Sequence, residues 1–299
     1  MQGVFVPRLR DPVRTIAGRT FDFDRQVAVM AVVNRTPDSF YDKGATFALE
    51  KANEAVDKAV GEGADWVDIG GVKFSPNDGE VASSVELERV LPVVEAAART
   101  HPNVVISVDT FRVDVAQAAL VAGAHIINDT TGLHDPALAD LVAANPHTQL
   151  IITHSRAKPR THFPRPQYAD IAGEIAAFLR DRVEIALTRG VRPEQIIIDP
   201  GHDLNKNTHH TLELTRRLHE ISLIGYPTLA AVSNKDFIGE TLDRPHGERL
   251  SGSLAAAVFS ILQGARIVRM HNVRESVDAV RMTEAILGWR EPAYTLHNM

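Results

Sequence analysis

The segment Val27-Ala28-Val29-Met30-Ala31-Val32-Val33-Asn34-Arg35-Thr36-Pro37-Asp38-Ser39-Phe40 joins an apolar run directly to an amide, a hydroxyl, a proline and an acid. The apolar part is typical of a buried strand. In parallel α/β proteins, the carboxyl ends of such strands open into the loops that bind ligands. The segment therefore predicts a parallel sheet with a functional site where this strand ends.

After residue 27, short β-branched runs alternate with longer stretches of helical spacing. The predicted strands are 27–33, 66–69, 104–108, 125–128, 149–153, 196–199, 228–232 and 266–269. The predicted helices lie near 47–62, 84–99, 112–122, 136–144, 169–189, 208–220, 252–263 and 274–287. Gly63, Gly123, Gly190 and Gly264 stand where four of these helices end, as expected for left-handed helix termination. Eight units in about 270 residues favour an α/β fold of the (β/α)8 TIM-barrel type over a doubly wound sheet of five or six strands.

The chain is predicted to form a single domain, because no Pro-, Gly- or Ser-rich run divides it. Residues 27–290 are assigned to the barrel, and residues 1–26 to an N-terminal extension. Within the extension, Phe21-Asp22-Phe23-Asp24 alternates apolar and acidic residues. Residues 4–23 are therefore predicted to form a short hairpin that closes the bottom of the barrel.

The composition is that of a soluble globular protein, with 44% hydrophobic and 23% charged residues. A formal net charge of -6 argues against nucleic-acid binding. The absence of cysteine excludes disulfides, thiolate zinc sites and thiol nucleophiles, and suits a reducing cytoplasm. No apolar run approaches the ~18 residues of a membrane helix. We therefore expect a cytoplasmic protein with no membrane partner.

Every predicted strand ends in a polar or charged group. These groups are Asn34, Asp68, Asp109, Asn128, His154, Asp199, Ser233 with Lys235, and Arg269 with His271. One such aspartate alone is more simply explained as a helix cap or turn residue, but eight similar strand ends favour a shared site. Since unpaired buried carboxylates are costly, the acids predict a flat ligand rich in N–H and amino donors. Lys235, Arg269 and His271 follow the last two strands and predict a cationic group for an anionic tail.

Six short motifs, taken in order and spacing, resemble the dihydropteroate synthase family. These are pterin-binding barrels that join a dihydropterin pyrophosphate to p-aminobenzoate. The motifs are Asn34-Arg35-Thr36-Pro37-Asp38-Ser39-Phe40, Asp68-Ile69-Gly70-Gly71, Ser107-Val108-Asp109-Thr110, Gly123-Ala124-His125-Ile126-Ile127-Asn128-Asp129, Asp199-Pro200-Gly201 and Arg269-Met270-His271.

This resemblance implies a role for each matching residue. Asp109, Asn128, Asp199 and Lys235 would hold the pterin ring, with Asp68 lining the same mouth. Asn34, Arg269 and His271 would hold the pyrophosphate, with Mg²⁺ near Asn34. The implied reaction expels pyrophosphate from an exocyclic methylene, and the aryl amine attacks the resulting cation without a covalent enzyme intermediate. No catalytic residue is assigned, although Lys235 is the candidate if the protein is active.

The chain departs from the family pattern mainly in the loops that would contact the second substrate. In Gly70-Gly71-Val72-Lys73-Phe74-Ser75-Pro76-Asn77, Phe74 and Ser75 replace the usual Thr-Arg pair. Asn234 replaces a second arginine. In Asp199-Pro200-Gly201-His202-Asp203-Leu204-Asn205-Lys206, Asp203 and Leu204 replace a glycine and the phenylalanine that walls the aryl amine. Thr153-His154-Ser155 replaces Met-His-Met, and Arg35 replaces an aliphatic residue.

These losses are selective, whereas neutral loop drift would spread more evenly. They predict a diverged second homologue that keeps a pterin-like pocket but has little or no dihydropteroate synthase activity. Two alternatives stay open: an active synthase in which Arg35, Lys43, Lys73 and Phe74 compensate, and a non-catalytic binding subunit. The expected ligands are a pterin-like molecule and sulfonamide- or sulfone-type mimics of p-aminobenzoate. The apolar helix near 252–262, together with the resemblance, predicts a homodimer.

Overall fold

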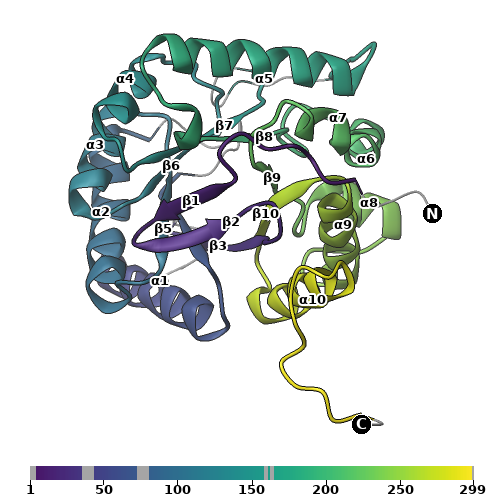
Figure 1. Ribbon diagram of the computed structural model, residues 1–299. Coiled ribbons are helices and arrows are strands. Elements are labelled where there is room, and N and C mark those ends of the chain that lie inside the picture. Colours follow the sequence, from purple (N-terminus) through teal and green to yellow (C-terminus); the bar gives the residue numbers. More distant parts are fainter. Residues whose placement is uncertain (1–4, 36–43, 73–80, 158–160, 162–164, 298–299) are drawn as a thin grey trace.

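Eight parallel strands form a closed barrel surrounded by helices (Figure 1). This computed structural model describes residues 5–35, 44–72, 81–157, 161 and 165–297. The barrel strands are β3 Ala28–Asn34, β4 Trp66–Gly70, β5 Val105–Asp109, β6 Ile126–Asp129, β7 Gln149–Thr153, β8 Ile196–Asp199, β9 Thr228–Ala230 and β10 Ala265–Met270. Pairing of β10 with β3, from Ile267 opposite Ala28 to Met270 opposite Ala31, closes the sheet. The TIM-barrel prediction is confirmed, and the doubly wound alternative is wrong.

The helices lie outside the barrel, close to their predicted positions. They are α1 Gly44–Gly61, α2 Ser83–Thr100, α3 Val113–Ala122, α4 Ala137–Ala144, α5 Ile171–Thr188, α6 Thr208–Arg216, α7 Leu218–Ser222, α8 Asp236–Leu242, α9 Leu250–Leu262 and α10 Val273–Ile286, with a 3-10 turn η2 at Pro193–Gln195. The helix predicted at 208–220 is divided at Arg217. Helix α8 was not predicted, because it is short and contains Gly239. Gly239 leaves room for the Arg249 side chain, because a Cβ there would lie 2.3 Å from the Arg249 guanidinium.

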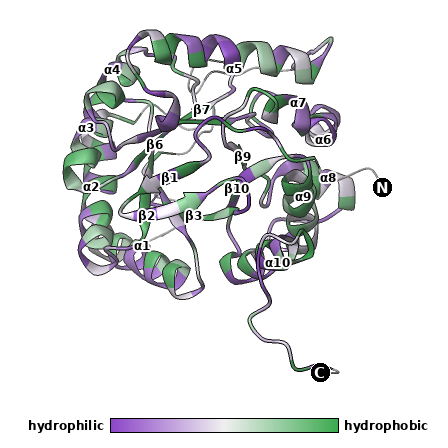
Figure 2. Cartoon of the chain, viewed as in Figure 1, coloured by the Kyte–Doolittle hydropathy of each residue, from purple (hydrophilic) through white to green (hydrophobic). Residues whose placement is uncertain are grey.

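The inward face of the barrel changes from apolar to polar halfway along its strands. Towards the amino ends, Trp66, Val105, Ile126 and Ile267 belong to one fully buried cluster. Two residues further on, the same face carries Asp68, Ser107, Asn128 and Arg269, because side chains alternate with a period of two. The outward residues pack against the helices, which are hydrophobic on part of their surface (Figure 2). The barrel therefore has an apolar floor and a polar mouth.

A short antiparallel hairpin covers the floor of the barrel (Figure 1). It consists of β1 Val13–Ile16 and β2 Arg19–Asp22, joined by Ala17 and Gly18, both with positive φ, as in the turns that suit tight hairpins. The buried ring of Phe21 contacts Trp66 edge-on, with ring centroids 5.7 Å apart. The hairpin prediction is confirmed, although the paired residues are fewer than 4–23. The division of the chain at residue 26 stays a prediction.

Arg35 has a structural partner in helix α2. Pro92 lies inside α2 and has no N–H to donate to the Glu88 carbonyl one turn earlier. The Arg35 guanidinium donates to that oxygen at 2.8 Å and to the Arg89 oxygen at 2.7 Å. Arg35 therefore supplies the hydrogen bond that the proline removes, which ties the end of β3 to α2.

We predict that Arg35→Leu lowers the free energy of unfolding by about 1–3 kcal/mol, because the Glu88 carbonyl loses its donor. In a Pro92→Ala background the loss should be about 1 kcal/mol smaller, since the introduced alanine restores the helical N–H. Urea denaturation of the four proteins measures this coupling. Strict additivity of the two substitutions would contradict it.

Candidate functional site

The centre of the polar layer is an ion pair between Asp68 and Arg269. The Asp68 side chain is fully buried, and its Oδ2 accepts a hydrogen bond from Arg269 Nε at 2.7 Å. Ser107 Oγ donates to Oδ1 at 2.6 Å, and Asn128 Nδ2 donates to Oδ2 at 3.1 Å. Asp68 therefore lies beneath the mouth rather than lining it, because donors from three other strands already occupy its oxygens. It positions Asn128 and Arg269.

Asp109 lies above this pair and is less completely satisfied. Its Oδ2 is 3.8 Å from Arg269 Nη2, and its Oδ1 accepts a long hydrogen bond of 3.4 Å from Thr130 Oγ1. The pKa of Asp109 is raised to about 7, mainly by burial and then by the nearby Asp68 carboxylate, while Arg269 opposes both effects. At neutral pH the Asp109 carboxyl therefore gains and loses a proton readily, and N–H donors would stabilise its charged form.

Asp199 ends β8 and is held by a fixed turn. Its Oδ1 accepts a hydrogen bond of 2.7 Å from the Gly201 N–H. Gly201 has a φ of +67°, and a Cβ there would lie 2.3 Å from the His154 carbonyl oxygen, so only glycine fits. Burial raises the pKa of Asp199 to about 6, while Lys235 and Lys206 act against this shift.

Two further acceptors on the inward face are buried without a hydrogen-bond partner among the described residues. They are Asn128 Oδ1 and Thr153 Oγ1. A buried polar atom without a partner costs about 1–3 kcal/mol, so such atoms are uncommon unless a ligand or water pairs with them. Together with Asp109 and Asp199, they give the mouth several acceptor atoms that are not fully paired with donors, as the polar strand ends predicted.

The predicted group of three cations is smaller in the structure. Arg269 pairs with Asp68 rather than standing opposite the acids. Burial, with Arg269 and Lys235 nearby, lowers the pKa of His271 to about 4, so its imidazole is neutral at pH 7 and lies 3.1 Å from Ser233 Oγ. Lys235 precedes α8, and burial lowers the pKa of its ammonium group. His271 therefore adds no positive charge at pH 7, and the charge of Arg269 is paired with Asp68.

Asn34 lies at the exposed end of β3, beside the mouth. Its Oδ1 lies 3.4 Å, and Asp109 Oδ2 3.9 Å, from the point that a Cβ on Gly70 would occupy. The missing side chain of Gly70 thus leaves two oxygens facing a common space. Among the described residues, no three His, Asp or Glu side chains gather as a set of metal ligands.

The residues that distinguish this chain from the family pattern have different placements. Lys43, Lys73, Phe74 and Ser75 lie outside the described residues. Asn234 has a φ of +57°, its N–H donates to Ser253 Oγ at 3.0 Å, and its carbonyl accepts from Arg249 at 3.0 Å. Asn234 thus forms the left-handed turn before Lys235, and the loop is anchored from α9.

Lys206 is a buried group whose role sequence reasoning missed. Its ammonium donates to the carbonyls of Gly201 at 2.7 Å and Leu204 at 2.9 Å, and lies 2.9 Å from His154 Nδ1. Burial lowers the pKa of Lys206 to about 7, and burial with the nearby lysine lowers that of His154 to about 2, so this imidazole accepts. The signal available was the lysine seven residues after Asp199. Lys206 holds the loop that follows β8.

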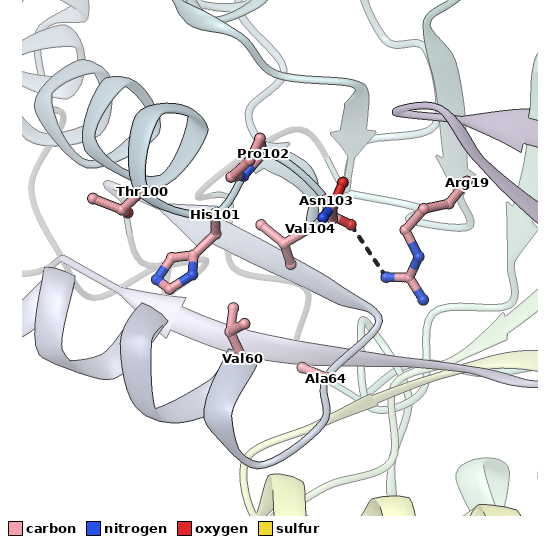
Figure 3. A pocket seen from close by; sticks show the side chains of 8 residues that line it. All are labelled: Arg19, Val60, Ala64, Thr100, His101, Pro102, Asn103 and Val104. Atoms are coloured by element: carbon pink, nitrogen blue, oxygen red, sulfur yellow. Dashed lines mark hydrogen bonds between the residues drawn. The ribbon is translucent and has the colours of Figure 1, made fainter.

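A cavity of about 280 Å³ lies at the opposite end of the barrel, away from the mouth (Figure 3). It is lined by Arg19, Val60, Ala64, Thr100, His101, Pro102, Asn103 and Val104. These residues come from the hairpin, the ends of α1 and α2, and the approach to β5. Arg19 donates to the Asn103 carbonyl at 3.3 Å across it. The cavity is therefore separate from the polar mouth.

The fold and the mouth define a (β/α)8 barrel with a small-molecule site at the carboxyl ends of its strands. The model of the family described as pterin binding enzyme matches residues 30–271. The protein of Mycobacterium tuberculosis called inactive dihydropteroate synthase 2 is 42% identical over 95% of this chain and 90% of its own length. The dihydropteroate synthase of Escherichia coli is 38% identical over 88% of this chain and 93% of its own length.

A solved structure shares the architecture as well as the sequence. The dihydropteroate synthase of Xanthomonas albilineans, crystallised with 4-aminobenzoic acid, aligns with a TM-score of 0.85 and 35% identity. The alignment covers 92% of this chain and 98% of that structure. The chain therefore belongs to the dihydropteroate synthase family of pterin-binding enzymes, as a diverged homologue.

We predict that Arg269→Met lowers the free energy of unfolding by about 3–5 kcal/mol, because it leaves the buried Asp68 charge without its cation. The double variant Asp68→Asn with Arg269→Met should recover much of this loss, since no buried charge then remains. Denaturant unfolding at pH 7 compares them. Equal destabilisation of the single and double variants would show that the pair does not govern this layer.

Proposed function

We propose that the barrel mouth binds a pterin-like heterocycle and that the protein has little or no dihydropteroate synthase activity. The observation that carries the first part is the group of incompletely paired acceptors on β5, β6 and β8: Asp109, Asn128 and Asp199. A pterin has ring N–H and amino groups in one plane. These donors would satisfy the acceptors, and Lys235 would donate to an acceptor atom of the ring.

Asp68 would act on the ligand through other residues, because its oxygens are occupied. It orients the Asn128 amide through Nδ2, and the buried Oδ1 of that amide has no hydrogen-bond partner among the described residues. It also holds Arg269, whose remaining N–H groups would bind a pyrophosphate in the charge-assisted way typical of guanidinium. His271, neutral at pH 7, would serve this anion as a hydrogen-bond donor rather than as a cation.

Mg²⁺ fits this site only together with an anionic ligand. Asn34 and Asp109 offer oxygen atoms around Gly70, and oxygen is the ligand type that Mg²⁺ prefers. The remaining ligands would be pyrophosphate oxygens and water, as is usual for Mg²⁺ bound with a phosphate substrate. When bound, the ion would neutralise charge on a departing pyrophosphate.

The proposed loss of synthase activity rests on the second-substrate side of the mouth. The relative from M. tuberculosis is itself named as inactive. In this chain Asn234 and Leu204 replace an arginine and a phenylalanine, and the Asn234 backbone serves the loop rather than a ligand. The related E. coli synthase supports the alternative of an active enzyme. If active, this chain would use Lys235 as its candidate catalytic residue.

The quaternary structure proposed from sequence is a homodimer through α9. Phe259 on this helix is 41% exposed, and Met282 and Ile286 on the neighbouring α10 are more exposed still. Large apolar side chains that are exposed on neighbouring helices are a common feature of protein interfaces. The location proposed is the cytoplasm, consistent with the lack of cysteine. None of the helices that the structure describes is long and apolar enough to span a membrane.

We predict that Phe259→Glu weakens self-association by about 2 kcal/mol or more, because it places a charge in an apolar contact. Light scattering over a dilution series measures the mass. Val121→Glu, an equally apolar exposed site on α3, is the matched control and should leave the mass unchanged. A monomeric wild-type protein, or equal effects of both variants, would refute an interface at α9.

We predict that the protein binds 6-hydroxymethyl-7,8-dihydropterin in calorimetry, and that Asp199→Asn weakens binding by about one to two orders of magnitude. The reason is that a charge-assisted hydrogen bond contributes about 1.5–3 kcal/mol. Asp140→Asn, an exposed acid on α4, is the matched control.

Turnover of the dihydropterin pyrophosphate with 4-aminobenzoate should fall about two to four orders of magnitude below that of the E. coli synthase. Turnover near the E. coli rate would establish the active-enzyme alternative.

The same titration tests the ionisation of the mouth. Folding raises the pKa of Asp109 from 3.8 to about 7 and that of Asp199 from 3.8 to about 6. The contribution of these two groups to the stability of the folded state is therefore fully present below pH 3.8. This stabilisation is lost as pH rises through 6 and 7. Pterin affinity should change oppositely, falling about tenfold or more between pH 8 and pH 5.5, because protonated carboxyls accept poorly. A constant affinity would exclude these carboxylates as the acceptors.

A further inference from the structure

Asp203 is held in one orientation beside the mouth. It lies in the loop between β8 and α6 with a φ of +62°, a conformation that glycine, asparagine and aspartate adopt most readily. Its Oδ1 accepts from Thr211 Oγ1 at 2.8 Å, and its Oδ2 accepts from the Phe237 N–H at 3.2 Å. Both oxygens therefore have a defined donor, and the second donor lies only two residues after Lys235.

This carboxylate acts on both lysines of the mouth. Among the neighbouring groups, its charge is the strongest influence that raises the pKa of Lys235 against the lowering effect of burial. It also raises the pKa of Lys206, after the larger effect of Asp199. Asp199 and Asp203 therefore act on both lysines, and Asp236 has a smaller effect on Lys235 alone. Asp236, the next acid along the chain, has a side chain 74% exposed and pairs with Arg249.

We infer that Asp203 determines the charge of the second ligand at the Lys235 side of the mouth, favouring a neutral aryl amine over an aryl amine that carries a carboxylate. An anion that approaches Lys235 meets a carboxylate that already compensates the lysine charge and is fixed by two hydrogen bonds. A neutral ligand of the same shape meets no such repulsion. This inference rests on the proposed pterin-like pocket, of which Lys235 is a part.

The test compares two probes of nearly equal shape, 4-aminobenzoate and 4-aminobenzamide, by calorimetry with the full-length protein. Wild-type protein should bind the amide more tightly. Asp203→Asn keeps the left-handed turn and removes the charge, and should shift the ratio of the two dissociation constants about tenfold towards the carboxylate. Asp203→Gly removes the same charge at a backbone position that glycine adopts freely, so it should shift the ratio in the same direction.

Asp236→Asn is the matched control, because it removes one charge from a solvent-screened position of the same loop. In this variant the ratio of the two dissociation constants should stay within about twofold of the wild-type value. A similar shift in the Asp236 variant would show that the ratio depends only on the net charge of the protein, and this would overturn the inference. So would an unchanged ratio in both Asp203 variants, or failure of 4-aminobenzoate to bind them. If the wild-type protein did not bind the dihydropterin, the proposed function would be refuted instead. The two outcomes can be distinguished because the dihydropterin and the aryl amines are titrated separately.

Discussion

The buried ion pair between Asp68 and Arg269 is the interaction on which the polar half of the barrel depends. Both charges are withdrawn from water, and such a pair is tolerable only where hydrogen bonds satisfy its remaining polar atoms. Ser107 and Asn128 provide them from the two strands that follow β4. As a result, both oxygens of Asp68 accept hydrogen bonds. Asn128 Oδ1 and Asp109, which lie above Asp68, have too few donors. The polar atoms that a ligand could pair with therefore lie at the mouth of the barrel rather than at its centre.

The sequence predicted the strands, most helices and the polar strand ends because these follow from local periodicity and from glycines at helix ends. It did not predict what depends on distant partners. The neutrality of His271 arises from burial beside Arg269 and Lys235, which only the closed barrel brings together. The role of Arg35 depends on Pro92, more than fifty residues later. Helix α8 escaped detection because Gly239 reflects contact with Arg249 rather than a helix end.

The mouth combines a retained acceptor surface with an altered rim. On β5, β6 and β8 the acceptors match what a pterin ring offers, and the family relationship agrees with that match. On the other side, Asn234, Leu204 and Asp203 change the shape and charge that a second ligand would meet. A barrel can keep one half of a two-substrate site while the other half diverges, because each half lies on different loops. We therefore regard ring binding and synthase turnover as separable properties of this protein.

The most direct test of this account is a crystal structure with 6-hydroxymethyl-7,8-dihydropterin bound. The account predicts the ring in the mouth, with its N–H and amino groups within hydrogen-bonding distance of Asp109, Asp199 and Asn128 Oδ1, while Asp68 keeps its contact with Arg269. A ring bound elsewhere, or one that displaces Arg269 from Asp68 to reach that carboxylate, would contradict the central claim.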